Sequence, residues 1–295
     1  MWGNCPDGGS DRDDTWASRP PSSSRLLAQG RLRGKGDGDM TADRVTPRQG
    51  PDSAASLVTR FAPSPTGRLH LGHAFSALQA HDAARSAGGS FLLRIEDIDP
   101  GRSRDQHIDG IIEDLQWLGL TWDGPIVRQS ERLGHYADAL ARLRAADLVY
   151  PCFCTRAAIA AEIAASAAAP HGPDGPLYPG TCRHLSIDER QRRMANEPHA
   201  WRLDVTEALD RAGPLSWIDL EHGPILATPA IHGDVVLARK DAPTSYHLAV
   251  TVDDAAFGIT DVIRGEDLLP ATHVHRLVQA VVQCLCDQRM VGHFA

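Results

Sequence analysis

The sequence has no apolar run long enough to span a bilayer, and its first residues lack the apolar core of a signal peptide. It carries six cysteines among 295 residues, too sparse a set for the disulfide framework of a small secreted domain. A positive net charge is also absent, since the formal value is −8. This balance argues against indiscriminate nucleic-acid binding but permits one basic face for an RNA partner. These absences predict a cytoplasmic protein without a membrane segment.

Residues 1–56 differ in composition from the rest of the chain. They are rich in glycine, aspartate, serine, arginine and proline and contain few apolar side chains. Such a segment cannot bury enough surface to offset the entropy lost on ordering. We expect a disordered N-terminal tail, in which Met40 is a candidate for the true start.

Residues 57–149 alternate between strand and helix patterns. Two short apolar runs, 57–61 and 90–95, read as buried strands. Apolar residues at helical spacing predict amphipathic helices over 73–87, 103–118 and 131–146. This alternation is typical of a parallel α/β sheet, and we interpret the region as the first half of a Rossmann-like domain.

The character of the chain changes over residues 150–240, which we interpret as an inserted subdomain. An alanine-rich helix is predicted from residue 155 to about 169, followed by a loop of proline and glycine. Strand patterns then occur near 200–205, 215–220 and 234–238, and buried-strand patterns resume at 246–252 and 259–264. Residues 241–280 are therefore expected to complete the Rossmann-like domain, before an atypical tail at 281–295.

The segment Arg60-Phe61-Ala62-Pro63-Ser64-Pro65-Thr66-Gly67-Arg68-Leu69-His70-Leu71-Gly72-His73 is the most informative part of the sequence. It reads as a strand end, a proline- and glycine-rich turn, and a helix that begins near Gly72. Free N–H groups and the positive end of a helix dipole favour phosphate at such a place. His70 and His73 can donate hydrogen bonds to phosphate oxygens as charge develops on them.

The run His70-Leu71-Gly72-His73 resembles the HIGH signature of class I aminoacyl-tRNA synthetases, and the preceding Arg-Phe-Ala-Pro-Ser-Pro-Thr-Gly run is similar to the glutamyl branch. The resemblance implies ATP binding, with Mg²⁺, and stabilisation of the phosphates by three catalytic residues, His70, Gly72 and His73. The ATP-binding residues that it implies are Pro63, Ser64, Thr66, Gly67, His70, Gly72 and His73.

Residues 245–254 and 258–269 are similar to the second half of the glutamyl-type fold. The resemblance implies an L-glutamate pocket. A guanidinium group suits a carboxylate, which makes Arg60 and Arg264 candidates for the substrate carboxylates, while Glu96 can hold the ammonium group. The glutamate-binding residues implied are Arg60, Phe61, Ala62, Pro63, Ser64, Glu96, Tyr246 and Arg264.

Four further acidic residues follow Tyr246, in the pairs Asp253-Asp254 and Glu266-Asp267. A carboxylate pair can bind a metal, but we interpret both pairs as solvated or helix-capping acids. Asp97 and Asp99 are interpreted as structural, because a glutamate carboxylate is already ionised and its attack on ATP needs no protein base.

Cys152, Cys154 and Cys182 form a candidate metal site. Structural zinc takes four tetrahedral ligands, usually cysteine or histidine, so His171 or His184 could complete the set. The run Tyr178-Pro179-Gly180-Thr181-Cys182 resembles that of glutamyl-queuosine tRNA(Asp) synthetases, which implies Tyr178 as the fourth ligand of one structural Zn²⁺. Three buried free cysteines are the alternative.

The resemblance extends over residues 58–277 and implies a class I synthetase catalytic domain with a zinc-bearing, acceptor-binding-like insertion. The implied activity is conversion of L-glutamate and ATP into glutamyl-adenylate, then transfer to the queuosine base of tRNA(Asp), by a monomer. No run resembles the KMSKS loop that follows in the family. Three alternatives stay open: a truncated glutamyl-tRNA synthetase charging tRNA(Glu), a catalytically impaired RNA-binding fragment, and a small-molecule nucleotidyltransferase.

Overall fold

The computed structural model describes residues 56–165, 171–173 and 175–290. Of the predicted N-terminal tail, only residue 56 belongs to these, and Met40 lies outside them. The end of the predicted alanine-rich helix, 166–169, and the last residues of the tail, 291–295, also lie outside.

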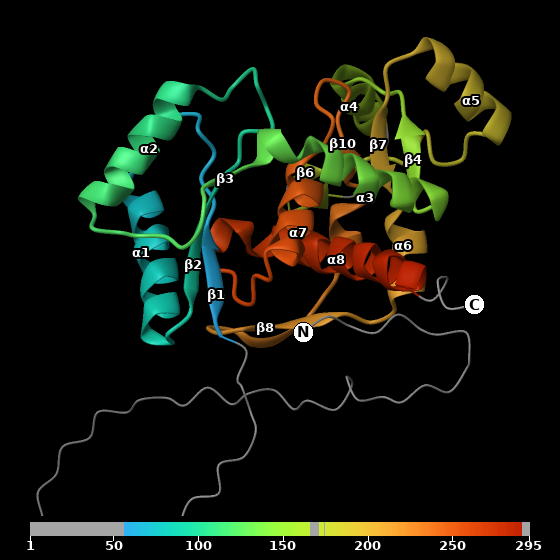
Figure 1. Ribbon diagram of the computed structural model, residues 1–295. Coiled ribbons are helices and arrows are strands. Elements are labelled where there is room, and N and C mark those ends of the chain that lie inside the picture. Colours follow the sequence, from blue (N-terminus) through green and yellow to red (C-terminus); the bar gives the residue numbers. More distant parts are fainter. Residues whose placement is uncertain (1–55, 166–170, 174, 291–295) are drawn as a thin grey trace, which may run out of the picture. The chain divides into compact units, whose positions relative to one another are not determined.

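The first part of the fold is a three-stranded parallel sheet with the order β1-β2-β3, built from β1 (Val58–Phe61), β2 (Ser90–Ile95) and β3 (Val127–Arg128). Helix α1 (Leu71–Ser86) follows β1, and α2 (Asp105–Trp117) follows β2. Figure 1 shows both helices beside the sheet, where their apolar sides share one core with its strands. The predicted α/β fold with a parallel sheet is confirmed.

A second sheet is antiparallel, with the order β10-β7-β4. Its strands are β4 (Val149–Cys152), β7 (Ala200–Leu203) and β10 (Val236–Ala238). They share a core with four helices, which are α3 (Leu133–Ala145), α6 (Val205–Ala212), α7 (Tyr246–Ala256) and α8 (Leu269–Met290). Helix α3 is preceded by the short 3-10 helix η1 (Gln129–Arg132).

Smaller elements make up the rest of the described fold. Helices α4 (Arg156–Ala165) and α5 (Ile187–Asn196) flank the hairpin of β5 (His171–Gly172) and β6 (Gly175–Pro176) along the chain. A second hairpin joins β8 (Ser216–Asp219) to β9 (Gly223–Leu226). The 3-10 helices η2 (Pro229–His232) and η3 (Glu266–Leu268) complete the described elements. Within the described residues, no helix combines the length and apolarity needed to cross a membrane.

The two strands predicted at 246–252 and 259–264 are wrong. The first segment is α7, whose N-terminus is capped by the Ser245 hydroxyl accepting a hydrogen bond from the Leu248 N–H. Because α7 packs against α3, α8 and β10, consecutive residues are buried and the apolar run imitates a buried strand. The second segment has no regular structure, although the Thr260 N–H donates to the Val58 carbonyl of β1 at 3.0 Å.

Gly89 lies in the turn between α1 and β2, and a substitution there tests how closely this turn packs against the backbone before β1. A Cβ atom at this position would lie 2.0 Å from the Leu57 carbonyl oxygen, which accepts the Ser90 N–H. We expect Gly89→Ala to lower the free energy of unfolding by about 1–3 kcal/mol, because the backbone must shift. In the matched control Gly134→Ala, on α3, the new methyl group meets open space. Urea denaturation should show that control unchanged or slightly stabilised, and equal losses in both variants would contradict this account.

Candidate active site

The turn after β1 is held at the ends of β1 and β2. The Pro63 carbonyl accepts the Glu96 N–H at 3.0 Å, and the Pro65 carbonyl accepts the Arg104 N–H at 3.2 Å. Phe61 and Pro63 are buried, Ala62 and Gly67 are half-buried, and Ser64 and Thr66 are exposed. The turn therefore presents two hydroxyl groups to solvent at the carboxyl edge of the parallel sheet.

His70 and His73 cap the N-terminus of α1. His70 Nδ1 accepts from the Gly72 N–H at 3.2 Å, and His73 Nδ1 accepts from the His70 N–H at 3.4 Å. The two rings are stacked with centroids 3.7 Å apart, and burial, together with the neighbouring His70, lowers the pKa of His73. Because each Nδ1 is an acceptor, a neutral ring carries its proton on Nε2. The arrangement can offer two Nε2–H donors to an anion at a helix N-terminus.

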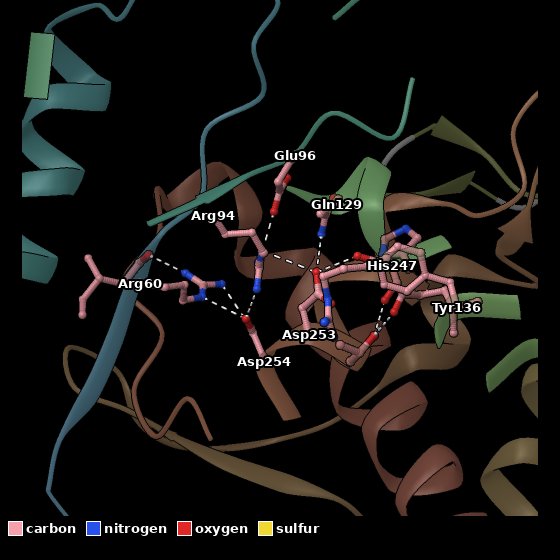
Figure 2. Close-up of polar contacts among 12 residues, drawn as sticks. Arg60, Arg94, Glu96, Gln129, Tyr136, His247, Asp253 and Asp254 are labelled. Atoms are coloured by element: carbon pink, nitrogen blue, oxygen red, sulfur yellow. Dashed lines mark hydrogen bonds and ion pairs between the residues drawn. The ribbon is translucent and has the colours of Figure 1, made fainter. Parts of the chain in front are cut away.

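A buried arginine lies at the centre of the charged residues beside this turn. The Arg94 side chain is 3% exposed, and its Nη1 donates to Asp254 Oδ1 at 2.6 Å. Its Nη2 donates to Glu96 Oε1 at 3.2 Å, and its Nε lies 3.9 Å from Asp253 Oδ2. Figure 2 shows the three carboxylates around this guanidinium group. They raise the pKa of Arg94 although burial opposes this, so the group stays charged.

Arg60 contacts the same carboxylate as Arg94. Its Nε donates to Asp254 Oδ1 at 3.1 Å and its Nη2 to Asp254 Oδ2 at 3.3 Å, while Nη1 lies 3.4 Å from the Ile263 carbonyl oxygen (Figure 2). Burial alone would raise the pKa of Asp254, but the guanidinium groups of Arg60 and Arg94 hold it below its usual range. Asp254 is therefore an ionised, buried bridge between β1, β2 and α7.

Asp253, the neighbouring residue on α7, joins a different set of partners. Its carboxylate accepts from Gln129 Nε2 at 3.0 Å, from Arg132 Nε at 2.7 Å and from the Tyr136 hydroxyl at 2.8 Å. The side chain is fully buried. The hydrogen bonds of Asp253 thus tie α7 to η1 and α3, with one longer ion pair to Arg94 of β2, whereas the hydrogen bonds of Asp254 tie α7 to the parallel sheet.

The interpretation of Asp253 and Asp254 as solvated or capping acids is wrong. Both are buried in ion pairs, because arginines distant in sequence approach α7 in the fold. Sequence reasoning also missed Arg94. The signal that could have found them is the position of two acids inside an apolar run, where a buried charge requires a partner. Glu266 and Asp267 are exposed.

Asp97 and Asp99 both hold backbone in place. Asp97 is buried and accepts from the Ser130 N–H and hydroxyl, each at 2.8 Å, and from Arg128 Nε at 3.0 Å. Asp99 accepts from the Gly101 N–H at 3.1 Å and from Arg239 Nη1 at 3.2 Å. These contacts support the structural interpretation of both residues.

Tyr246 interacts electrostatically with Glu96 and with Arg264. Burial raises the pKa of Glu96, although Arg94 and Arg60 oppose the rise. Burial raises the pKa of Tyr246 to about 12, and nearby Glu96 adds to this. Burial lowers the pKa of Arg264, with Asp219 and Tyr246 opposing, and its Nη2 lies 3.6 Å from Asp219 Oδ2. These interactions thus link the cations Arg60 and Arg264, the acid Glu96 and the phenol Tyr246, which come from four segments of the chain.

The three cysteines of the second motif lie together. The sulfur atoms of Cys152, Cys154 and Cys182 are all within 4.8 Å of one another. The Tyr178 hydroxyl lies 3.5 Å from Cys152 Sγ and 3.7 Å from Cys154 Sγ, and it accepts the Cys182 N–H at 2.9 Å. His184 is exposed and does not belong to this cluster, and the side chain of His171 lies outside the described part of the chain.

The chemistry of this cluster suits a cation that prefers thiolate ligands. Burial alone would raise the pKa of Cys152, but Tyr178 and Arg202 lower it, and the Arg202 guanidinium lies 3.9 Å from the centre of the Tyr178 ring. Burial raises the pKa of Cys154 to about 11. A metal ion among the sulfur atoms would favour their deprotonated forms. Three sulfur atoms and one phenol oxygen fit a four-coordinate site.

The fold and the charged site define the catalytic domain of a class I tRNA synthetase. Residues 56–291 match the family described as tRNA synthetases class I (E and Q), catalytic domain. The chain is 50% identical over 234 residues to the glutamyl-Q tRNA(Asp) synthetase of Rhodobacter capsulatus, covering 77% of this chain and 82% of that protein. The corresponding protein of Symbiobacterium thermophilum is 48% identical over 229 residues, 73% of this chain and 68% of that protein. The chain belongs to the glutamyl-Q tRNA(Asp) synthetase family.

Solved structures agree with this family. A glutamate tRNA ligase from Elizabethkingia meningosepticum, in complex with its amino acid, superimposes with a TM-score of 0.65 at 30% identity. The aligned region covers 78% of this chain and 47% of that chain, so this protein spans about half the length of the ligase. The resemblance seen in the sequence is confirmed.

The lowered pKa of Asp254 predicts a pH dependence of stability. A carboxyl group whose pKa is lower in the folded state adds stability above its unfolded pKa of about 3.9 and loses it as the pH falls through the folded value. We therefore expect Asp254→Asn to be less stable than the wild type near neutral pH, with the difference shrinking below about pH 4. Urea denaturation from about pH 7 to about pH 3 measures it. An Asp210→Asn variant, at an exposed position, is the control, and a difference that grows on acidification would contradict the assignment.

Proposed function

We propose that this protein activates L-glutamate with ATP and transfers it to the queuosine base in the anticodon loop of tRNA(Asp). In the first step a glutamate carboxylate oxygen attacks the α-phosphorus of ATP, a carbon-oxygen-phosphorus link forms, and pyrophosphate leaves. A nucleophile on the queuosine base then attacks the activated carbonyl, and AMP leaves. The observation that carries the proposal is the 50% identity to a glutamyl-Q tRNA(Asp) synthetase over 82% of that relative's length.

The buried charged residues support a glutamate pocket. Arg60 and Arg264 supply cations for two carboxylates, and Glu96 supplies an anion for the ammonium group. Tyr246, whose pKa is raised to about 12, stays a neutral hydrogen-bond donor. The turn of Phe61, Ala62, Pro63 and Ser64 is tied to Glu96 through the Pro63 carbonyl, so it borders the same pocket.

The N-terminus of α1 supports an ATP phosphate site. Its residues are His70, Gly72 and His73, and the adjoining turn contributes Pro63, Ser64, Thr66 and Gly67. The two Nε2–H donors and the helix dipole would stabilise negative charge as pyrophosphate leaves. Gly72 leaves room for the His70 ring at this place, because a Cβ atom there would lie 3.2 Å from the ring. ATP would bring Mg²⁺ with it, since a divalent ion neutralises the phosphates.

A glutamyl-tRNA synthetase acting on tRNA(Glu) is the second candidate. The solved glutamate tRNA ligase supports it through shared fold and 30% identity. Relatives at 48–50% identity carry the queuosine-linked name, which favours the first candidate. The acceptor RNA therefore separates the two.

We also propose that Cys152, Cys154, Tyr178 and Cys182 bind one structural Zn²⁺. The apolar core around them is small, with Tyr150, Phe153 and two of the cysteines buried in it. When bound, zinc would cross-link the end of β4 to the loop before α5 and so add the stability that this core lacks.

The proposed activity predicts glutamate-dependent exchange of pyrophosphate into ATP without any tRNA. It further predicts transfer of radiolabelled glutamate to tRNA(Asp) that carries queuosine. The Arg264→Ala variant should raise the KM for glutamate at least tenfold, because it removes a cation from the pocket. Thin-layer assay of labelled ATP and filter binding of labelled tRNA provide the measurements.

The matched acceptors are tRNA(Asp) lacking queuosine and tRNA(Glu), neither of which should be labelled. Labelling of tRNA(Glu) alone would establish the second candidate. RNA binding without exchange would instead identify a catalytically impaired RNA-binding protein.

The proposed metal site predicts about one zinc per chain in the purified protein, measured by mass spectrometry of the metal. Cys182→Ser should lose most of this zinc and melt at a lower temperature, because one of three thiolates is removed. Thr181→Ala is the matched control, since Thr181 is exposed and donates to Glu162 at 2.6 Å outside the cluster. Zinc retained by the Cys182 variant, or absent from the wild type, would refute the site.

A further inference from the structure

The orientation of Arg60 is set by a residue outside the motifs that predicted the pocket. A guanidinium group has a side edge, formed by Nε and one Nη, and an outer edge, formed by both Nη atoms. The side edge of Arg60 donates two hydrogen bonds to the Asp254 carboxylate, from Nε at 3.1 Å and from Nη2 at 3.3 Å. The outer edge then points away from Asp254. Nη1 donates one of its two N–H groups to the Ile263 carbonyl at 3.4 Å, which leaves the other for a ligand. A second carboxylate can approach Arg60 in two-pronged fashion only at this outer edge.

Asp254 is itself held from a second side. Arg94 Nη1 donates to its Oδ1 at 2.6 Å, and the Nη2 of the same guanidinium donates to Glu96 at 3.2 Å (Figure 2). Arg94 is 3% exposed and Asp254 8% exposed, so water cannot substitute for these contacts. The Asp254 carboxylate therefore contacts Arg60 directly and is linked to Glu96 through Arg94.

We propose that Asp254 is a positioning residue for the amino-acid substrate: it turns Arg60 so that its outer edge receives a glutamate carboxylate, and through Arg94 it sets Glu96 for the ammonium group. The inference rests on the proposed function, because it deepens the role of the same pocket. Asp254 need not touch glutamate itself. Its contribution is to fix two opposite charges at a constant separation, as a zwitterionic substrate requires.

The isosteric variant Asp254→Asn tests this role in pyrophosphate exchange. An amide offers Arg60 one acceptor oxygen instead of two and carries no charge, so the side edge is released. We expect the KM for glutamate to rise about tenfold or more, and the KM for ATP to stay within about twofold. An equal rise in both constants, or no change in the KM for glutamate, would overturn the proposal.

Asp253→Asn is the matched control. Asp253 is the adjacent residue of α7, is fully buried and also binds an arginine, but its hydrogen-bond partners are Gln129, Arg132 and Tyr136. It faces Arg94 only as an ion pair at 3.9 Å from Nε, and it does not contact Arg60. A purely structural role of these acids predicts the same kinetics in both variants. We expect the Asp253 variant to melt at a lower temperature while its KM for glutamate changes less than about twofold.

Two additions make the test decisive. If Asp254→Asn does not fold, Asp254→Glu keeps the charge and moves the carboxylate by one methylene, and positioning still predicts a raised KM for glutamate. If the wild type shows no exchange, the proposed function fails. The orientation of Arg60 can then be tested without activity, from the Arg60 Nε–H signal in ¹⁵N NMR. The Arg60→Lys variant assigns this signal. Loss or shift of that signal in the Asp254 variant supports the inference, and an unchanged signal overturns it.

Discussion

The fold around the site depends on compensating the charge of Arg94. A guanidinium group that is 3% exposed cannot be solvated, and leaving it unpaired would cost several kcal/mol. Its partners are Glu96, which directly follows β2, and Asp253 and Asp254 of α7. The helix therefore has to approach the parallel sheet although more than a hundred residues of chain separate the two. This approach brings Tyr246, at the start of α7, next to the residues at the carboxyl edge of the sheet.

The same principle holds the cysteine-bearing part to the antiparallel sheet. Asp234 is buried, and its carboxylate binds Tyr150 of β4, Arg183 and the backbone N–H of Val205. Each of these partners comes from a different element, so one carboxylate joins β4, α6 and the loop after Cys182. A buried acid with several donors is stable only when all of them are present. The cysteine cluster is thus anchored on one side by polar contacts and, on our proposal, closed on the other by zinc.

The sequence predicted most of the local structure in the first half, because strands and helices there have distinct apolar periods. It failed at α7, where an apolar run is buried on several sides and the period disappears. The motif residues from Arg60 to His73 were found because glycine, proline and histidine at that spacing have few other uses. Asp254 was missed because its role is defined by Arg60 and Arg94, which lie 194 and 160 residues away. No local pattern carries such information, although two acids within an apolar segment already require buried partners.

The charges of the site are balanced before any substrate arrives. Arg60, Arg94 and Arg132 face Glu96, Asp253 and Asp254, so the network attracts an arbitrary anion only weakly. Glutamate adds one net negative charge, and Arg264 is the cation outside this set, paired loosely with Asp219 at 3.6 Å. Fixed geometry at Arg60 and Glu96 would then select a molecule with an ammonium and a carboxylate at one separation. The more adaptable Arg264 would recognise the second carboxylate, so selectivity comes from the spacing of charges rather than from their sum.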